Sequence, residues 1–264
     1  MTLPASRLHS LPDTLDPARA RALQAALGQE PDIMAGSPLP GFFHQIYFWD
    51  PRPPADLGPD GHPRPDVRIP GIALPRRMWA AGRVLFHQPL IAGMQAERIT
   101  AVEAVTRREG RSGRLAFVRL RHDIRQRRAL ALTEWQELVY REAAGEGPAP
   151  LAPRAPETAE VAYDWQADST LLFRYSALTC NGHRIHYDAD YARGVEGYGG
   201  LVVHGPLLVQ MLVMLAEARA PLTEISYRAT APLLANEPAR LCAQGQTLWV
   251  AGRDGRQCMT ARVR

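Results

Sequence analysis

Lysine is absent from this sequence, so all 31 of its basic residues are arginines. This absence excludes chemistry that needs a lysine amine, such as a Schiff base or the phosphate-binding lysine of a P-loop. Arginine instead offers a planar, permanently charged group that suits a carboxylate or a phosphate. The formal net charge is only +4, and the one dense basic segment, Arg119–Arg128, has no interleaved aromatic residues. We therefore expect no nucleic-acid partner.

Cysteine and long apolar segments are also scarce. Cys180, Cys242 and Cys258 are the only cysteines and show no Cys-x-x-Cys spacing, so we expect neither disulfides nor structural zinc. The first twenty residues lack the apolar segment of a signal peptide. The longest apolar run, "PLLVQMLVMLAEARA", is too short to span a bilayer. We expect a cytoplasmic protein with no membrane association.

The chain divides into two similar halves. A Pro/Ala/Gly-rich stretch, "AAGEGPAPLAPRAP", has the composition of a linker, which predicts an N-terminal domain over 1–145, a linker over 146–160 and a C-terminal domain over 161–264. "PLIAGMQAERI" from Pro89 is similar to "PLLANEPARL" from Pro232, and "GRSGR" from Gly110 to "GRDGR" from Gly252. The two matches have nearly the same offset, which predicts a duplicated unit.

Each half has the pattern of an antiparallel β-meander, with strand-like segments separated by Pro and Gly turns. Residues 170–178 are also strand-like. The second half contains one helix, expected over 205–219, with Pro206 in its first turn and apolar residues on nearly every side. Such a helix must be buried, so a sheet should wrap around it. The matching positions of the first half cannot form this helix, which leaves space for a bound tail. The sequence thus predicts an α+β double hot-dog fold, with two antiparallel sheets and a degenerate helix in the first unit.

The stretch "YSALTCNGHRIHYD" places His183 and His186 three residues apart. A metal site would need further ligands, and Asn181-Gly182 favours a turn, so we expect no metal here. A catalytic site is the alternative, in which His186 transfers a proton near neutral pH. The free N–H groups at the start of the predicted helix, at Gly205, would bind a developing oxyanion. Together these groups suit the addition of water to an α,β-unsaturated thioester.

The same stretch resembles the hydratase-2 motif of MaoC-like enoyl-CoA hydratases, in which an Asp precedes a catalytic His by five residues. Asn181 stands at the Asp position and His186 at the His position, while His183 and Arg184 replace the Asn-Pro between them. "YSALTCNGHRIHYDADYA", "GLVVHGPLLVQML", "PRRMWAAGR" and "APLLANEPARLCA" resemble the branch that contains mesaconyl-C4-CoA hydratases, itaconyl-CoA hydratases and mitochondrial type-2 hydroxyacyl-thioester dehydratases.

The resemblance implies roles for several residues. His186 would be the base, Asn181 would orient it or the water, and the Gly205 amide would hold the thioester oxygen. Asp188 and His183 are candidates for the second proton-handling group, although Asp188 is equally suited to cap a short helix at "DADYARGVE". His204 is expected to shape the turn before the helix. The candidates for substrate binding are Arg184, Arg174, Arg76, Arg77 and Trp79.

The predicted function is reversible hydration of a short, branched, dicarboxylic enoyl-CoA, such as itaconyl-CoA or mesaconyl-C4-CoA, to citramalyl-CoA. No cofactor is expected beyond the coenzyme A of the substrate, whose phosphates would contact surface arginines. A homodimer is possible. Three alternatives remain open: a 3-hydroxyacyl-thioester dehydratase for fatty-acyl chains, a thioesterase, and a non-catalytic acyl-CoA-binding protein. Asn181 in place of Asp favours the last.

Overall fold

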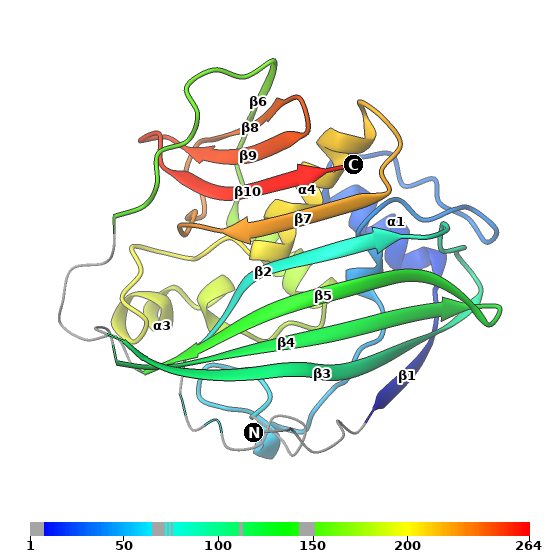
Figure 1. Cartoon of the computed structure of the whole chain (residues 1–264), viewed down its shortest axis with the longest axis horizontal. Coiled ribbons are helices and arrows are strands. Elements are labelled where there is room, and N and C mark those ends of the chain that lie inside the picture. The colour runs from blue at the N-terminus through cyan, green and yellow to red at the C-terminus, as the bar shows by residue number, and fades with distance from the viewer. Residues whose placement is uncertain (1–7, 65–71, 73, 75, 111–112, 143–150) are drawn as a thin grey trace.

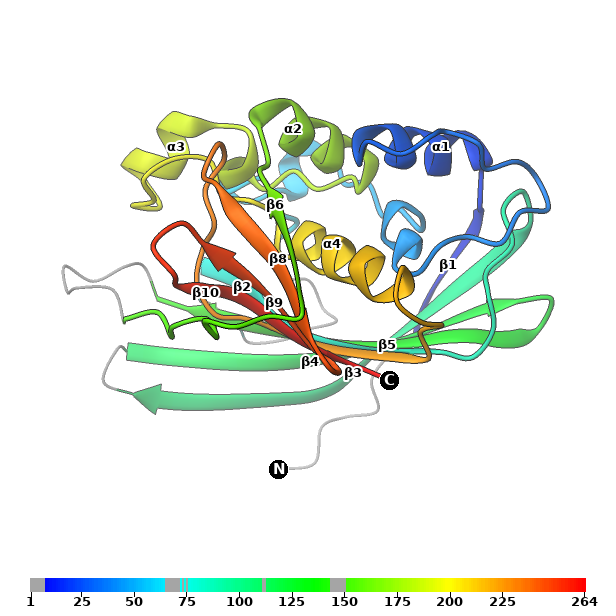
Figure 2. The ribbon, with the colours of Figure 1, turned by 90° about the horizontal axis from the view of Figure 1, so that it is seen from above.

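The computed structural model describes residues 8–64, 72, 74, 76–110, 113–142 and 151–264. Within them, ten strands form one antiparallel sheet, and four α-helices lie on one of its faces (Figure 1, Figure 2). The strands are β1 (His9–Thr14), β2 (Arg76–Phe86), β3 (Gln95–Gly110), β4 (Gly113–Gln126), β5 (Ala129–Arg141), β6 (Val161–Trp165), β7 (Glu224–Ala229), β8 (Ala239–Gln244), β9 (Thr247–Gly252) and β10 (Gln257–Val263). The helices are α1 (Pro17–Ala26), α2 (Ser169–Leu178), α3 (Ala189–Gly194) and α4 (Gly205–Glu217), with short 3₁₀ helices at Phe43–Ile46, Pro54–Asp56 and Arg184–His186.

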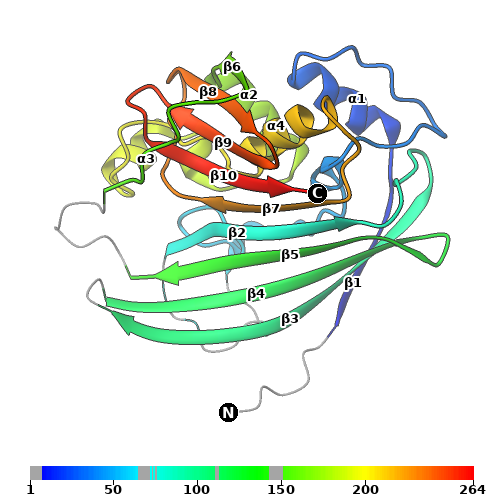
Figure 3. The same ribbon diagram turned by 45° about the horizontal axis from the view of Figure 1, so that its top comes forward.

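The strand order confirms the predicted duplication. It is β1-β3-β4-β5-β2-β7-β10-β9-β8-β6, which has the same pattern from either end when β1 to β5 are matched with β6 to β10. The two halves meet where Ala81–Leu85 of β2 pairs with Glu224–Arg228 of β7. The two predicted antiparallel sheets are therefore joined edge to edge (Figure 3). The predicted linker begins at residues that lie outside the described ones, and its described part carries one isolated bridge, between Arg154 and Arg256.

Only one of the two sequence matches reflects this symmetry. Pro89 lies between β2 and β3, and Pro232 lies between the corresponding strands β7 and β8. The other match was wrong, because Gly110 lies where β3 passes to β4 whereas Gly252 lies where β9 passes to β10. Glycine-containing turns recur between antiparallel strands for local reasons, so five similar residues do not establish equivalence.

The buried helix was predicted correctly. α4 ends two residues before the expected end, and its nine buried residues cover almost its whole circumference. It lies between the sheet and the outer helices α1 and α2 (Figure 2). Pro206 lies in its first turn, where a proline costs no helical hydrogen bond, since the first N–H groups of a helix have no partner within it.

The first half has no counterpart of α4 within its described residues. Between α1 and β2 these residues contain only two 3₁₀ helices, although part of this stretch, residues 65–71, 73 and 75, lies outside the description. The aromatic segment around Phe42–Phe48 fills the core beside the sheet. The positions that the sequence matched to α4, residues 62–76, lie largely outside the described residues, so the degenerate helix stays a prediction there.

One element was predicted wrongly. Residues 170–178 belong to the helix α2 and not to a strand. Asp168 caps α2, because its side chain accepts a hydrogen bond of 2.7 Å from the backbone N–H of Leu171. The described residues include no helix long and apolar enough to cross a membrane.

Candidate active site

The loop from α2 to α4 carries the candidate histidines. The chain turns at Cys180, whose φ is +50°. Asn181 then accepts, through Oδ1, a hydrogen bond of 3.0 Å from the backbone N–H of His183. This local turn uses the Asn181 oxygen and fixes the direction in which the chain continues. Asn181 therefore shapes the loop, and the hydrogen bond of its side chain is made to this backbone N–H and not to His186.

His186 is buried at the end of a 3₁₀ helix, and one contact defines its tautomer. Its Nδ1 lies 2.7 Å from the carbonyl oxygen of Val202. A carbonyl only accepts, so Nδ1 carries the proton and Nε2 keeps a lone pair. Burial lowers the pKa of His186 to about 4; the bond to Val202 opposes this shift and His62 adds to it. His186 is thus neutral at pH 7 and can accept a proton at Nε2.

His204 packs against the ring of His186 and holds it in place. The two rings are stacked, with centroids 3.6 Å apart and 19° between their planes. The Nε2 of His204 lies 2.8 Å from the hydroxyl of Ser176, on α2. His204 is fully buried, and burial lowers its pKa well below the usual value. His204 therefore stays neutral and holds the ring of His186 in place, which extends the turn-shaping role expected for it.

The N-terminus of α4, at Gly205, follows directly after His204. A Cβ at this position would lie 2.7 Å from the ring of Trp79, so only glycine lets β2 and α4 approach this closely. Trp79 in turn stacks on Tyr227, with ring centroids 4.7 Å apart. The positive end of the helix dipole faces this region. An oxygen that gains negative charge would be stabilised here.

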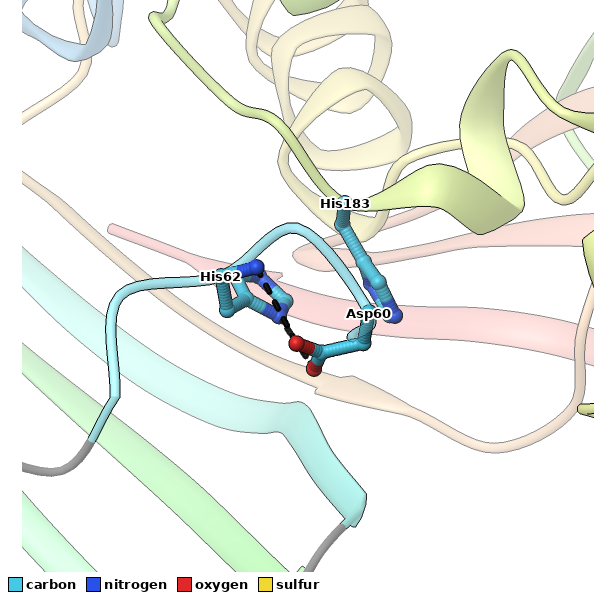
Figure 4. Close-up of side chains that lie close together, drawn as sticks. All are labelled: Asp60, His62 and His183. Carbon is cyan, nitrogen blue, oxygen red and sulfur yellow. Dashed lines mark hydrogen bonds and ion pairs between the residues drawn. The ribbon is translucent and has the colours of Figure 1, made fainter. Parts of the chain in front are cut away.

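A second loop, from the first half of the chain, completes the site. Gly61 has a φ of +84°, and a Cβ on it would overlap the carbonyl oxygen of Gly182. The two loops therefore cross in direct contact. The Nδ1 of His62 lies 3.1 Å from Oδ2 of Asp60, and the ring centroids of His62 and His183 are 4.2 Å apart. Figure 4 shows the three side chains converging.

Asp60, His62 and His183 are also donors of the types that bind a metal ion. One ligand atom from each lies within 4.8 Å of the others. Burial lowers the pKa of both His62 and His183, and the charge of the nearby Arg77 lowers both further. A fixed positive charge beside the donors opposes a cation and favours an anion. The geometry permits a metal ion here, and the charge of Arg77 opposes one.

His62, His183, His186 and Gly205 line one cavity of about 570 Å³, to which both halves of the chain contribute. On the side of the first unit it extends to Arg98, Thr100 and His122, on β3 and β4. This is the face that has no counterpart of α4 in the described part of the unit. The cavity thus includes the extra space expected from the degenerate helix.

Comparison with known proteins agrees with this geometry. A family model described as hydroxyacyl-thioester dehydratase type 2 matches residues 42–235. The chain belongs to that family. It is 42% identical over 254 residues to the mesaconyl-C(4)-CoA hydratase of Chloroflexus aurantiacus, covering 92% of this chain and 91% of the relative. It is 26% identical to the mitochondrial hydroxyacyl-thioester dehydratase type 2 of Schizosaccharomyces pombe, covering 83% and 82% of the two chains.

Solved structures confirm the fold of this type-2 dehydratase family member. HtdX of Mycobacterium tuberculosis superposes with a TM-score of 0.70 at 19% identity, covering 98% of this chain and 99% of its own. A second Mycobacterium tuberculosis protein, described as having a double hotdog fold, gives a TM-score of 0.61 at 14% identity and covers 99% and 96% of the two chains. Both the predicted family and the predicted fold are confirmed.

Of the four candidate arginines in this family member, two line the cavity. Arg76 is buried in it and forms an ion pair with Glu196. Arg77 also lines it, and within the described residues no carboxylate pairs with Arg77. Arg174 was expected on a strand that leads to the site, but it lies on α2, and the residues that line the cavity do not include it.

Arg184 and Asp188 stabilise the segment between α2 and α3. Arg184 pairs with Asp188 at 2.7 Å and lies over the ring of Tyr191. The other Asp188 oxygen accepts from the backbone N–H of Tyr191, so Asp188 caps α3 as the sequence allowed. Both carboxylate oxygens of Asp188 are engaged, and neither residue is among those that line the cavity. The capping role is thereby favoured over a role in proton transfer.

Sequence reasoning missed Asp60 and His62. They lie in "GPDGHPRP", a stretch rich in turn-forming residues, and nothing in their spacing relates them to His183. The one available signal was a histidine in a loop of the unit that lacks the helix. That histidine could be assigned to the site only with the knowledge that its loop contacts the loop that carries Gly182.

Proposed function

We propose that this protein is a hydro-lyase that adds water reversibly to a short, branched, dicarboxylic enoyl-CoA, with mesaconyl-C4-CoA as the first candidate and itaconyl-CoA as the second. The observation that carries the proposal is the 42% identity to a mesaconyl-C(4)-CoA hydratase over nine tenths of both chains. The geometry supports it, because a neutral buried histidine and a helix N-terminus line one cavity.

The residues of the cavity match the steps of hydration. With mesaconyl-C4-CoA, whose double bond is conjugated with the thioester, the water oxygen bonds to the β-carbon while one water proton passes to Nε2 of His186. The π electrons move toward the α-carbon and the thioester oxygen, where the N-terminus of α4 at Gly205 stabilises the negative charge. A proton added to the α-carbon then completes citramalyl-CoA. No step in this sequence requires a redox change.

Arg77 is the proposed partner of the free carboxylate. In mesaconyl-C4-CoA that carboxylate is bonded to the β-carbon, so its partner must lie close to the base. Arg77 lines the cavity and acts electrostatically on His62 and His183. Arg76 is already compensated by Glu196. A charge-assisted bond from Arg77 would distinguish a dicarboxylic acyl group from a simple one.

The test is to offer the purified protein mesaconyl-C4-CoA, itaconyl-CoA and crotonyl-CoA, and to follow enoyl absorbance together with product mass. Turnover of the carboxylate-bearing esters with a gain of one water supports the proposal. Preference for crotonyl-CoA and longer chains would instead support a fatty-acyl dehydratase. Release of free CoA would indicate a thioesterase, and binding without turnover a non-catalytic protein.

A further inference from the structure

Four of the eight histidines form a continuous row across the site. Ring centroids are 4.2 Å apart between His62 and His183, 5.4 Å between His183 and His186, and 3.6 Å between His186 and His204. Ser176 ends the row at His204, and Asp60 ends it at His62. The row thus has a carboxylate at one end only.

Hydration moves two protons, and His186 accounts for one of them. The second transfer, to or from the α-carbon, needs another group. Asn181 cannot ionise, and both oxygens of Asp188 are engaged outside the cavity. Burial, together with His62 and His186, lowers the pKa of His183 to about 2, so His183 stays neutral.

His62 has what the other imidazoles of the row lack. Its Nδ1 contacts the Asp60 carboxylate at 3.1 Å, and the same carboxylate accepts from the His62 backbone N–H at 3.1 Å. Burial alone would raise the pKa of Asp60, but the hydrogen bonds from His62 outweigh it and lower that pKa. The carboxylate is therefore ionised, and His62 is the imidazole of the row whose protonated form it stabilises directly.

We infer that His62, oriented by Asp60, is the second proton-handling group and exchanges a proton with the α-carbon of the substrate. This assignment rests on the proposed hydratase activity. In hydration, Nε2 of protonated His62 gives its proton to the α-carbon as His186 takes one from water. His186 then releases its proton to solvent and His62 takes one up, which restores the starting state. Asp60 acts through His62 and is a positioning residue.

The missing carboxylate of the hydratase-2 motif is thereby supplied from the other half of the chain. The Gly61–Gly182 crossing brings it there, and two hydrogen bonds hold the crossing. The backbone N–H of Arg184 donates to the Asp60 carbonyl at 2.9 Å, and its guanidinium donates to the Pro59 carbonyl at 3.1 Å. The Asp60–His62 pair is thus fixed relative to His186.

The charged and titratable groups that face His62 come from four elements: Asp60 from its own loop, Arg77 from β2, His183 from the loop after α2, and Glu196 from the segment after α3. Burial, the largest effect, and the charge of Arg77 lower the pKa of His62 below its usual value, while the hydrogen bond to Asp60 and the charges of Asp60 and Glu196 oppose this shift. Removing the Asp60 charge should therefore move the alkaline limb of the hydration rate to lower pH.

The experiment measures kcat, KM and pH profiles of wild type, His62→Gln, Asp60→Asn and the control His87→Gln, all with mesaconyl-C4-CoA. His87 is an exposed histidine outside this cavity, and its variant should retain the wild-type rate. We expect His62→Gln to lose roughly 10²–10⁴-fold in kcat with little change in KM. Asp60→Asn should lose less and show the shifted alkaline limb. Free imidazole should partly restore kcat to His62→Ala, which a purely structural role would not allow.

Three outcomes would overturn the inference. Wild-type kcat in His62→Gln would remove His62 from the mechanism and leave the hydratase assignment intact. Loss of wild-type activity on chelation, with recovery on adding Zn²⁺, would make Asp60, His62 and His183 a metal site instead. Absence of turnover by the wild-type chain with every enoyl-CoA would overturn the proposed function and this assignment together.

Discussion

His186 and His204 lie face to face, with ring centroids 3.6 Å apart and 19° between the ring planes. Neither ring can rotate freely, because Nδ1 of His186 is bonded to Val202 and Nε2 of His204 to Ser176. The Nε2 of His186 therefore has one fixed direction before any substrate arrives. Fixing a proton acceptor in this way removes part of the entropic cost of the reaction.

Substituting His186→Gln should remove the base and keep the fold. We expect kcat/KM for the enoyl-CoA substrate to fall roughly 10²–10⁴-fold. Glutamine can still donate toward the Val202 carbonyl, so the thermal midpoint should change little. Steady-state kinetics and a melting curve check this, and a variant with the wild-type rate would exclude His186 as the base.

Substituting Ser176→Ala should destabilise the protein. The change leaves the fully buried His204 without its 2.8 Å partner, and an unsatisfied buried group costs about 1–3 kcal/mol. Urea unfolding measures the effect. The control is Ser169→Ala on the same helix, at an exposed side chain, and this control should leave the free energy of unfolding nearly unchanged. Equal effects in both variants would contradict the prediction.

Substituting Gly205→Ala should impair both stability and activity, because the added methyl would lie 2.7 Å from the Trp79 ring. Overpacking of this kind costs about 1–3 kcal/mol, and displacement of α4 would move the expected oxyanion site. The matched control is Gly194→Ala at the end of α3, where nothing lies within 4 Å of the added carbon. The control should be neutral or stabilising by up to about 1 kcal/mol.

Substituting Arg77→Ala should lower kcat/KM more for dicarboxylic substrates than for substrates without a free carboxylate. Losing one charge-assisted hydrogen bond costs about 1.5–3 kcal/mol, which lowers kcat/KM for mesaconyl-C4-CoA by roughly 10–100-fold. The same change should affect crotonyl-CoA far less, since that ester has no free carboxylate. Arg174→Ala serves as the control, because Arg174 lies outside the cavity. Equal losses on both esters would assign Arg77 a general role.

Acid should destabilise the fold through its buried histidines. Burial lowers the pKa of His122 and His186 from 6.5 to about 4 in each case. Between these values the unfolded chain binds more protons than the folded one, so the free energy of unfolding falls as pH drops from about 6.5 to 4. Each group contributes on the order of 3 kcal/mol. Urea unfolding across this range tests the sign, and His186→Gln should give a shallower slope.

The sequence was most informative where the structure depends on local pattern. The apolar run around Leu207–Val213 could only be a buried helix, and the alternating strands of both halves were recognisable from their turns. Residues 170–178 were misread because Thr170, Phe173 and Tyr175 are residue types common in strands, whereas the Asp168 cap begins a helix. Helix caps act through one hydrogen bond and leave little trace in a hydrophobic pattern.

The site was predicted in part for the same reason. His186 and Gly205 lie in one continuous motif, so their proximity to a common cavity could be expected. Asp60 and His62 reach that cavity only because two loops cross at Gly61 and Gly182. Arg76 resembled a substrate-binding group in the sequence, but its partner Glu196 lies 120 residues away. Contacts between distant segments depend on the complete fold, and one sequence does not reveal them.

The palindromic strand order has a consequence for how many reactions one molecule can perform. Two identical units related by a twofold axis would carry two equal sites, and each would need its own helix. Here the C-terminal unit contributes the helix α4. The N-terminal unit contributes the part of the cavity beside β3 and β4, and the loop that carries Gly61. In the part of the chain that the structure describes, the two fused halves contribute different residues to one asymmetric site, so either half can change without forcing the same change on the other.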